Sequence, residues 1–157
     1  MVRRLKFESD WGAGFHLAAA MTDVVRSSLV GPWRKPVVVP VPLHRSRERQ
    51  RGFNQAAWLG AGVAADHGLT LHPRQLVRSR ATLPQGDPRV LGRGANVEGA
   101  FVLRGRSRVR GRRVLLVDDV TTSGATARAC SRVLLEHGAV EVALLTACAS
   151  APSDVST

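Results

Sequence analysis

The segment that most constrains this chain runs from Val114 to Thr126 and reads VLLVDDVTTSGAT. Its first four residues are all apolar, which is typical of a strand buried on both faces of a parallel sheet. The strand carries Asp118 and Asp119 to its carboxyl end, and a turn rich in hydroxyl groups leads into a helix that begins near Gly124. Open α/β sheets bind ligands at the carboxyl ends of their strands, so this segment predicts both an α/β fold and the location of a site.

The turn after the two aspartates has the chemistry of a phosphate cradle. A helix N-terminus offers backbone N–H groups and a positive dipole, and glycine lets the backbone approach a ligand closely. Two carboxylates beside a bound phosphate would repel it, so we expect them to face hydroxyl donors, such as those of a ribose, or a Mg²⁺ ion. The alternative is a strand, an ordinary helix cap and exposed acids, which explains each feature alone but not their order.

The rest of the chain alternates between helical and strand patterns. Apolar residues at three- and four-residue spacing predict helices over 13–30, 53–66 and 124–137. Short apolar runs predict strands over 36–40, 100–103, 114–117 and 139–146. Residues 44–55 are polar and basic and are expected to form a loop. This order predicts a single α/β domain over 1–150 with a mostly parallel sheet, followed by a flexible tail over 151–157.

One motif match is set aside. Gly60, Gly62 and Ala65 have the spacing of a dinucleotide-binding loop, but they lie within a helical pattern rather than after a strand. No acidic residue follows about 20 positions later, where such loops bind a ribose. We therefore interpret these residues as part of a helix.

The composition excludes several other classes of protein. No run approaches the 18 apolar residues of a membrane span, so no membrane partner is expected, and the basic start lacks the apolar core of a secretory signal. Cys130 and Cys148 are the only cysteines, which excludes a disulfide framework or a four-cysteine zinc site within this chain. These observations favour a cytoplasmic protein.

The net charge of +11 is concentrated in the middle of the chain. Residues 74–113 contain eleven arginines against only Asp87 and Glu98. Such a basic stripe suits a phosphate-rich ligand or a nucleic acid. The alternative is a solvated loop region whose arginines reflect coding bias.

The segment from Val114 to Thr126 resembles the phosphoribosyl pyrophosphate (PRPP) signature of type I phosphoribosyltransferases. The resemblance implies that Asp118 and Asp119 are the catalytic pair, which bind the ribose hydroxyls of PRPP and hold Mg²⁺, in part through water. It also implies a loop around the 5′-phosphate, formed by Thr121, Thr122, Ser123, Gly124, Ala125 and Thr126. The family usually has an apolar residue where Thr121 stands, and threonine is close enough in shape to valine for the turn to survive.

Two longer segments, 40–57 and 76–103, are similar to the ComF branch of this family, the competence protein F-like phosphoribosyltransferases. The similarity extends over nearly all of residues 3–148. The matching positions of the second segment are Thr82, Pro84, Gln85, Arg93, Asn96, Gly99, Ala100 and Phe101. ComF-type proteins often begin with a cysteine-rich zinc module that this chain lacks, so it is either a short form or one whose start lies upstream. Gly92 also stands where the branch commonly has an acidic residue.

The resemblance implies a type I phosphoribosyltransferase fold, with a mostly parallel central sheet flanked by helices and a flexible lid or hood. The pyrophosphate loop then falls on Pro42, Leu43, His44 and Arg45. Arg47 and Arg51 are further candidates for anion contacts, because guanidinium groups bind phosphate in a fork. The lid falls on 78–96, where Arg80 and Arg93 would touch the leaving pyrophosphate. For each arginine the alternative is a solvated basic loop.

The sequence is compatible with two different functions. The first is a Mg²⁺-dependent enzyme of nucleotide metabolism that transfers phosphoribosyl from PRPP to an unknown nitrogen acceptor and releases pyrophosphate. The second is a non-catalytic PRPP- or nucleotide-binding protein of competence and DNA uptake, whose partner is a competence-machinery protein or single-stranded DNA. The basic stripe contains one aromatic residue, Phe101, which is fewer than stacking on single strands requires. A homodimer is also left open.

Overall fold

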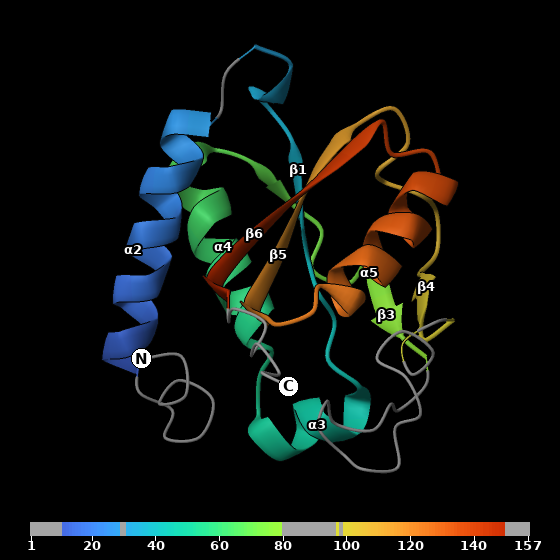
Figure 1. The fold of residues 1–157 in the computed structure, drawn as a ribbon, viewed down its shortest axis with the longest axis horizontal. Helices are drawn as coiled ribbons and strands as arrows, with labels where there is room; N and C mark the ends of the chain where they lie inside the picture. The colour runs from blue at the N-terminus through green and yellow to red at the C-terminus, as the bar shows by residue number, and fades with distance from the viewer. Residues whose placement is uncertain (1–10, 29–30, 80–96, 98, 150–157) are drawn as a thin grey trace, which may run out of the picture.

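The computed structural model describes residues 11–28, 31–79, 97 and 99–149. Its centre is a four-stranded parallel sheet in the order β2-β1-β5-β6 (Figure 1). The strands are β1 (Val37–Pro40), β2 (Thr70–Leu71), β5 (Arg113–Thr121) and β6 (Glu141–Ala149). This confirms the α/β fold with a parallel central sheet.

The two central strands are buried because their residues are apolar on both faces. Val38, Val114 and Leu116 have no exposed surface. Alternate residues of a strand point to opposite faces, so β1 and β5 each contribute to two cores. The strands pair from Val37 with Val114 to Pro40 with Val117.

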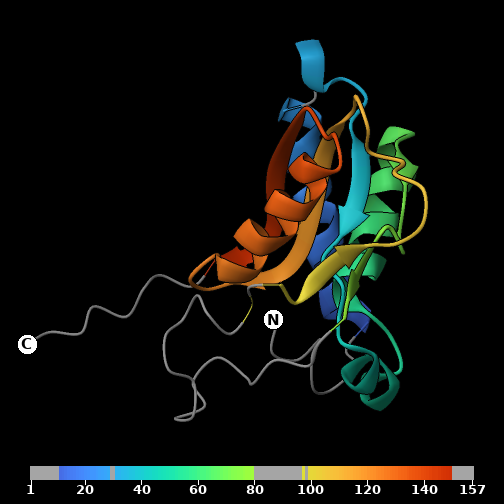
Figure 2. The ribbon, with the colours of Figure 1, turned by 90° about the vertical axis from the view of Figure 1, so that its right-hand side faces the viewer.

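Helices cover both faces of the sheet. Helices α2 (Trp11–Ser28) and α4 (Gln55–His67) pack on one face, where Val38, Leu115 and Val117 lie in one hydrophobic cluster. Helix α5 (Ala125–Glu136) covers the other face, as the turned view shows (Figure 2). None of the described helices has the length and apolar character needed to cross a membrane.

A small antiparallel sheet packs beside α5. It is formed by β3 (Leu76–Arg78) and β4 (Phe101–Leu103). Leu76 and Phe101 join the hydrophobic cluster on the α5 side of the central sheet. The strand predicted at 100–103 therefore exists, but it belongs to this separate sheet, and β2 and β3 were not predicted.

The loop predicted over 44–55 is wrong in part, because it contains helix α3 (Arg45–Arg51). None of its residues is buried, so it has no apolar face that the spacing of apolar residues would reveal. The ends of α3 are instead defined by capping residues. The His44 side chain accepts a hydrogen bond from the Ser46 N–H at the start of the helix, and Gly52 ends the helix with a left-handed φ of 80°. The tail predicted over 151–157 lies outside the described residues, and the single-domain interpretation stays a prediction.

The glycine motif set aside above lies within α4, as predicted. A Cβ atom at Gly60 would lie 3.4 Å from Val38 Cγ1 and 3.7 Å from Val117 Cβ, so this glycine lets α4 pack closely on the sheet. A Cβ atom at Gly62 would only make an ordinary contact of 3.6 Å with Ala18.

These two glycines predict opposite effects on stability. Gly60→Val should lower the free energy of unfolding by about 1–3 kcal/mol, because its branched side chain overpacks the contact with Val38. Gly62→Ala should raise it by about 0.5–1 kcal/mol, because alanine loses less backbone entropy in a helix. Urea denaturation of both variants measures the difference. Equal destabilisation would contradict the close packing at Gly60.

Candidate functional site

The candidate site lies at the carboxyl end of β1, where the neighbouring strand β5 extends beyond the last paired residue of β1. β1 stops at Pro40, which pairs with Val117, and the Val41 N–H then donates to the Val117 carbonyl at 2.8 Å. β5 runs on to Thr121, paired on its other side with β6. Asp118 and Asp119 therefore lie within the strand, in the part that no longer has β1 as a neighbour. Residues 41–44 and α3 follow β1 at the same end of the sheet (Figure 1).

The two aspartates lie on opposite faces of β5. Asp118 is 8% exposed, and its Oδ1 accepts a hydrogen bond from the Asp119 N–H at 2.9 Å. It alternates with Val114 and Leu116, which pack in one cluster with residues of α5, so it lies on the face of β5 that this helix covers, and its charge raises the pKa of the Cys130 thiol. Strand alternation then turns Asp119 to the opposite face. Asp119 is half-buried, and its Oδ1 accepts from the Val120 N–H at 2.8 Å.

The predicted phosphate loop leads directly into α5. Gly124 is the N-cap residue with a left-handed φ of 71°, a conformation that favours glycine. Its cap has no side-chain hydrogen bond, although the Ala125 N–H donates to Ser123 Oγ at 3.5 Å. The guanidinium of Arg128 lies over Gly124, because a Cβ atom built there would be 2.9 Å from Arg128 Nη1. A cation thus lies at the start of this helix, a position that the sequence analysis did not identify.

The predicted pyrophosphate loop connects β1 to α3. Pro42 is buried, Leu43 and His44 are half-buried, and Arg45 is exposed as the first residue of α3. His44 Nδ1 accepts a hydrogen bond from the Ser46 N–H at 3.3 Å and lies 2.7 Å from Ser46 Oγ. His44 has a capping role that the sequence did not predict.

Arg78 is a second cation that the sequence analysis missed. It is half-buried on β3, and its guanidinium lies 5.4 Å from the centroid of the Phe101 ring. Burial lowers the pKa of Arg78 below its ordinary value, and the Arg47 charge lowers it further, whereas Cys130 and Asp118 oppose the shift. Arg78, Arg47 and Asp118 therefore share one electrostatic environment. In the sequence, nothing distinguished Arg78 from the other arginines of the basic stripe.

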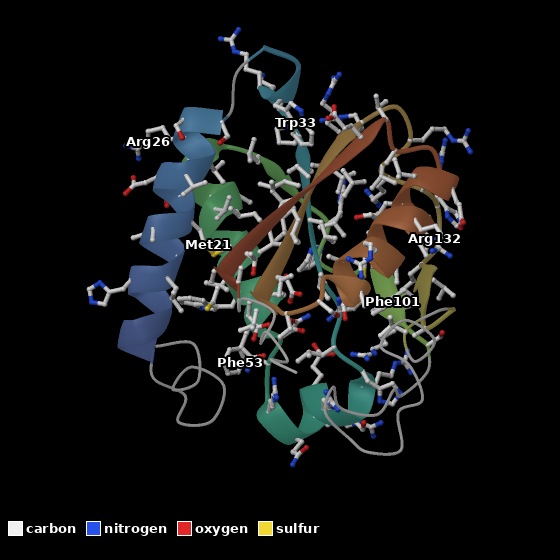
Figure 3. All side chains as sticks on the ribbon, viewed as in Figure 1. Met21, Arg26, Trp33, Phe53, Phe101 and Arg132 are labelled. Atoms are coloured by element: carbon white, nitrogen blue, oxygen red, sulfur yellow. The ribbon has the colours of Figure 1, made fainter. Side chains whose placement is uncertain are left out.

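A hollow of about 360 Å³ extends from the start of α5 along the helix. Ala125 lies at its phosphate-loop end, and Phe101 and Arg132 contribute from β4 and α5 (Figure 3). The lid residues Arg80 and Arg93 lie outside the described residues. No group of three or more His, Cys, Asp or Glu side chains able to hold a metal occurs within the described part of the chain.

The sequence matches the phosphoribosyl transferase domain model over residues 16–155. The chain is 29% identical over 145 residues to competence protein F of Haemophilus influenzae, covering 90% of this chain and 63% of that protein. It is 34% identical over 113 residues to competence protein ComFC of Bacillus subtilis, covering 71% and 43%. It is 33% identical over 111 residues to the DNA utilization protein YhgH of Escherichia coli K12, covering 71% and 48%. The chain spans about half the length of the curated relatives it matches.

Solved structures show the same fold at low sequence identity. Phosphoribosylpyrophosphate synthetase from Mycobacterium smegmatis matches with a TM-score of 0.54 and 16% identity, over 83% of this chain and 33% of that one. Purine phosphoribosyltransferase from Pyrococcus horikoshii matches with a TM-score of 0.51 and 15% identity, over 92% and 85%.

The environment of Cys130 predicts selective thiol chemistry. Burial raises the pKa of this thiol well above its ordinary value, and Asp118 raises it further. Cys148 is exposed. Because the thiolate is the reactive form, iodoacetamide at pH 8 should modify Cys148 and leave Cys130 intact in the native protein. Peptide mass mapping measures this, with labelling of both cysteines in urea as the control. Equal native labelling would contradict the placement of Cys130.

Proposed function

The chain belongs to the phosphoribosyl transferase domain family, in its ComF-type branch, and from that premise we propose that it binds PRPP at the carboxyl end of β5. The observation that carries the proposal is the order of groups along one continuous segment. Two carboxylates at Asp118 and Asp119 are followed within a few residues by the glycine-capped start of α5. This order suits a ligand with hydroxyl groups near one phosphate.

The 5′-phosphate would bind at the start of α5. Its first N–H groups and the helix dipole favour an anion there, and the half-buried hydroxyl of Ser123 is adjacent. Arg128 adds a guanidinium beside Gly124. A phosphate at this point would receive charge-assisted hydrogen bonds, which are stronger than neutral ones.

Mg²⁺ would bind together with PRPP rather than in a cage made by the protein alone. Mg²⁺ is commonly held by one or two carboxylates plus substrate phosphates and water, and because the two aspartates lie on opposite faces of β5, one of them would supply a single carboxylate to the ion. Asp119 is the more accessible of the pair, and Asp118 is nearly buried. When bound, the ion would neutralise charge on the pyrophosphate as it leaves.

The pyrophosphate would lie beside residues 42–45, Arg47 and Arg78. Arg47 and Arg78 are near enough for one charge to lower the pKa of the other, and such a like-charge pair favours an anion between them. In the proposed reaction, a nitrogen acceptor forms a bond to the anomeric carbon of the ribose. The bond from that carbon to the pyrophosphate oxygen breaks, and pyrophosphate leaves with the electron pair. The acceptor then loses its proton to solvent.

Substitution of the aspartates tests this proposal. Wild-type protein should bind PRPP in the presence of Mg²⁺, and Asp118→Asn/Asp119→Asn should weaken binding at least tenfold, because hydroxyl and metal contacts are lost. Asp23→Asn, which changes an exposed carboxylate on α2, is the matched control and should bind as wild type does. Calorimetry measures affinity, and a panel of nucleobases tested for pyrophosphate release measures transfer.

Two outcomes separate the functional alternatives. If wild-type protein binds no PRPP, both the transferase and the PRPP-sensing role are excluded. Binding without pyrophosphate release for any acceptor would favour the non-catalytic role. In that case the names of the relatives, a competence protein and a DNA utilization protein, suggest partners in DNA uptake.

A second candidate function is polyanion binding by the segment between β4 and β5, which leads to the amino end of the central sheet. Five exposed arginines lie in the segment before β5: Arg104, Arg106, Arg108, Arg110 and Arg112. Arg112 donates to the Lys35 carbonyl at 3.4 Å, next to the start of β1, and its own carbonyl accepts from Val140, next to the start of β6. Burial lowers the pKa of His72 below its ordinary value, and the charges of Arg108 and Arg112 lower it further. This basic surface suits the backbone of single-stranded DNA.

The dependence of DNA affinity on salt tests the second function. A poly-dT oligonucleotide should bind more weakly as salt rises, with a slope of about −0.7 per phosphate contacted. Replacing Arg104, Arg106, Arg108 and Arg110 with Gln should reduce both affinity and slope and should leave PRPP affinity unchanged. Fluorescence anisotropy at several salt concentrations measures this. Absence of binding at low salt, or an unchanged slope in the variant, would exclude this surface.

A further inference from the structure

Asn54 joins two elements of the candidate site through a single amide. Its Oδ1 accepts hydrogen bonds from the Ala56 N–H at 3.0 Å and from the Ala57 N–H at 3.4 Å, which caps the start of α4. Its Nδ2 donates to the Val41 carbonyl at 3.1 Å. Only one orientation of the amide satisfies all three contacts, since the oxygen must face the two donors and the nitrogen the acceptor.

Val41 is the first residue after β1, and residues 42–44 connect it to α3. Its N–H donates to the carbonyl of Val117, the residue immediately before Asp118. Pro40 and Pro42 on either side have no N–H, so Val41 supplies the only backbone donor of residues 40–42. Each of its two peptide groups is therefore held by one hydrogen bond, the N–H by β5 and the carbonyl by Asn54.

These contacts require both halves of the asparagine amide. Aspartate or serine at position 54 would still accept from the first N–H groups of α4, because both residues are good N-caps. Neither supplies a second group that donates to Val41. The capping requirement alone would thus be met by several residue types, and the bond to Val41 is the additional function of asparagine here.

We propose that Asn54 is a positioning residue, which holds residues 42–45 at a fixed distance from Asp118 so that they receive the pyrophosphate end of PRPP. The proposal rests on the proposed function of this site. Asn54 acts through the Val41 carbonyl and does not itself contact the ligand. Loss of the Asn54 Nδ2 donor frees the Val41 carbonyl and with it residues 42–45. The phosphate loop at the start of α5 is unchanged.

The test compares ligands that use different parts of the site. Asn54→Asp and Asn54→Ser should each bind PRPP and free pyrophosphate with Mg²⁺ about fivefold to tenfold more weakly, as expected for the loss of one hydrogen bond. Both should bind ribose 5-phosphate as wild type does. Gly68→Ala, at the other end of α4, is the matched control. It strains a left-handed φ of 61° and lowers stability, but should leave all three affinities unchanged.

A second measurement requires no ligand. Amide hydrogen exchange of Val41 and Ser46, whose N–H groups bond to the Val117 carbonyl and to His44 Nδ1, should be faster in Asn54→Ser than in wild type, while the Ala56 and Ala57 amides stay protected by the serine cap. Unchanged exchange of Val41 and Ser46 would overturn the proposal, as would equal weakening of all three ligands. If wild-type protein binds none of the ligands, the proposed function fails, and the exchange result alone decides the role of Asn54.

Discussion

The site depends on the unequal lengths of two paired strands. β1 ends at Pro40 because neither Pro40 nor Pro42 can donate to a sheet, and β5 continues for four residues beyond Val117. Past that point β5 is paired on one side only, with β6. Asp118 and Asp119 occupy this half-paired stretch. Two polar residues in a central strand are costly to bury without hydrogen-bond partners, and each of these carboxylates accepts a backbone N–H, from Asp119 and Val120 respectively.

Charge balance around Asp118 explains why so buried a carboxylate is tolerated. Its Oδ1 accepts a backbone hydrogen bond, and Arg78 lies in the same electrostatic environment. Arg78 in turn is held over Phe101, a core residue that packs in one cluster with Ala125 and Cys130. The small sheet of β3 and β4 thus connects the hydrophobic core to the charged end of the site. A buried charge without such a partner would cost several kcal/mol.

The sequence was most informative where apolar burial and chemistry occur in one continuous segment. The strand, the two aspartates and the start of α5 could be predicted from Val114–Thr126 because each follows from local pattern and turn chemistry. Helix α3 could not, because it buries no residue and depends on caps at His44 and Gly52. Arg78 and Asn54 could not either. Their roles depend on Phe101, Val41 and Val117, which lie far from them in the sequence and are brought close only by the fold.

Two groups of arginines in the described part of the chain lie in different parts of the fold. The charges of Arg47 and Asp118 both act on Arg78, whereas Arg110 and Arg112 lie just before β5, near Gly138 and Lys35. From Arg113 to Asp118 a strand rises roughly 17 Å at about 3.3 Å per residue. That distance is about twice the Debye length of about 8 Å at physiological salt, so the exposed charges of Arg110 and Arg112 add little attraction for an anion at the candidate site. These two arginines therefore require a different explanation from PRPP.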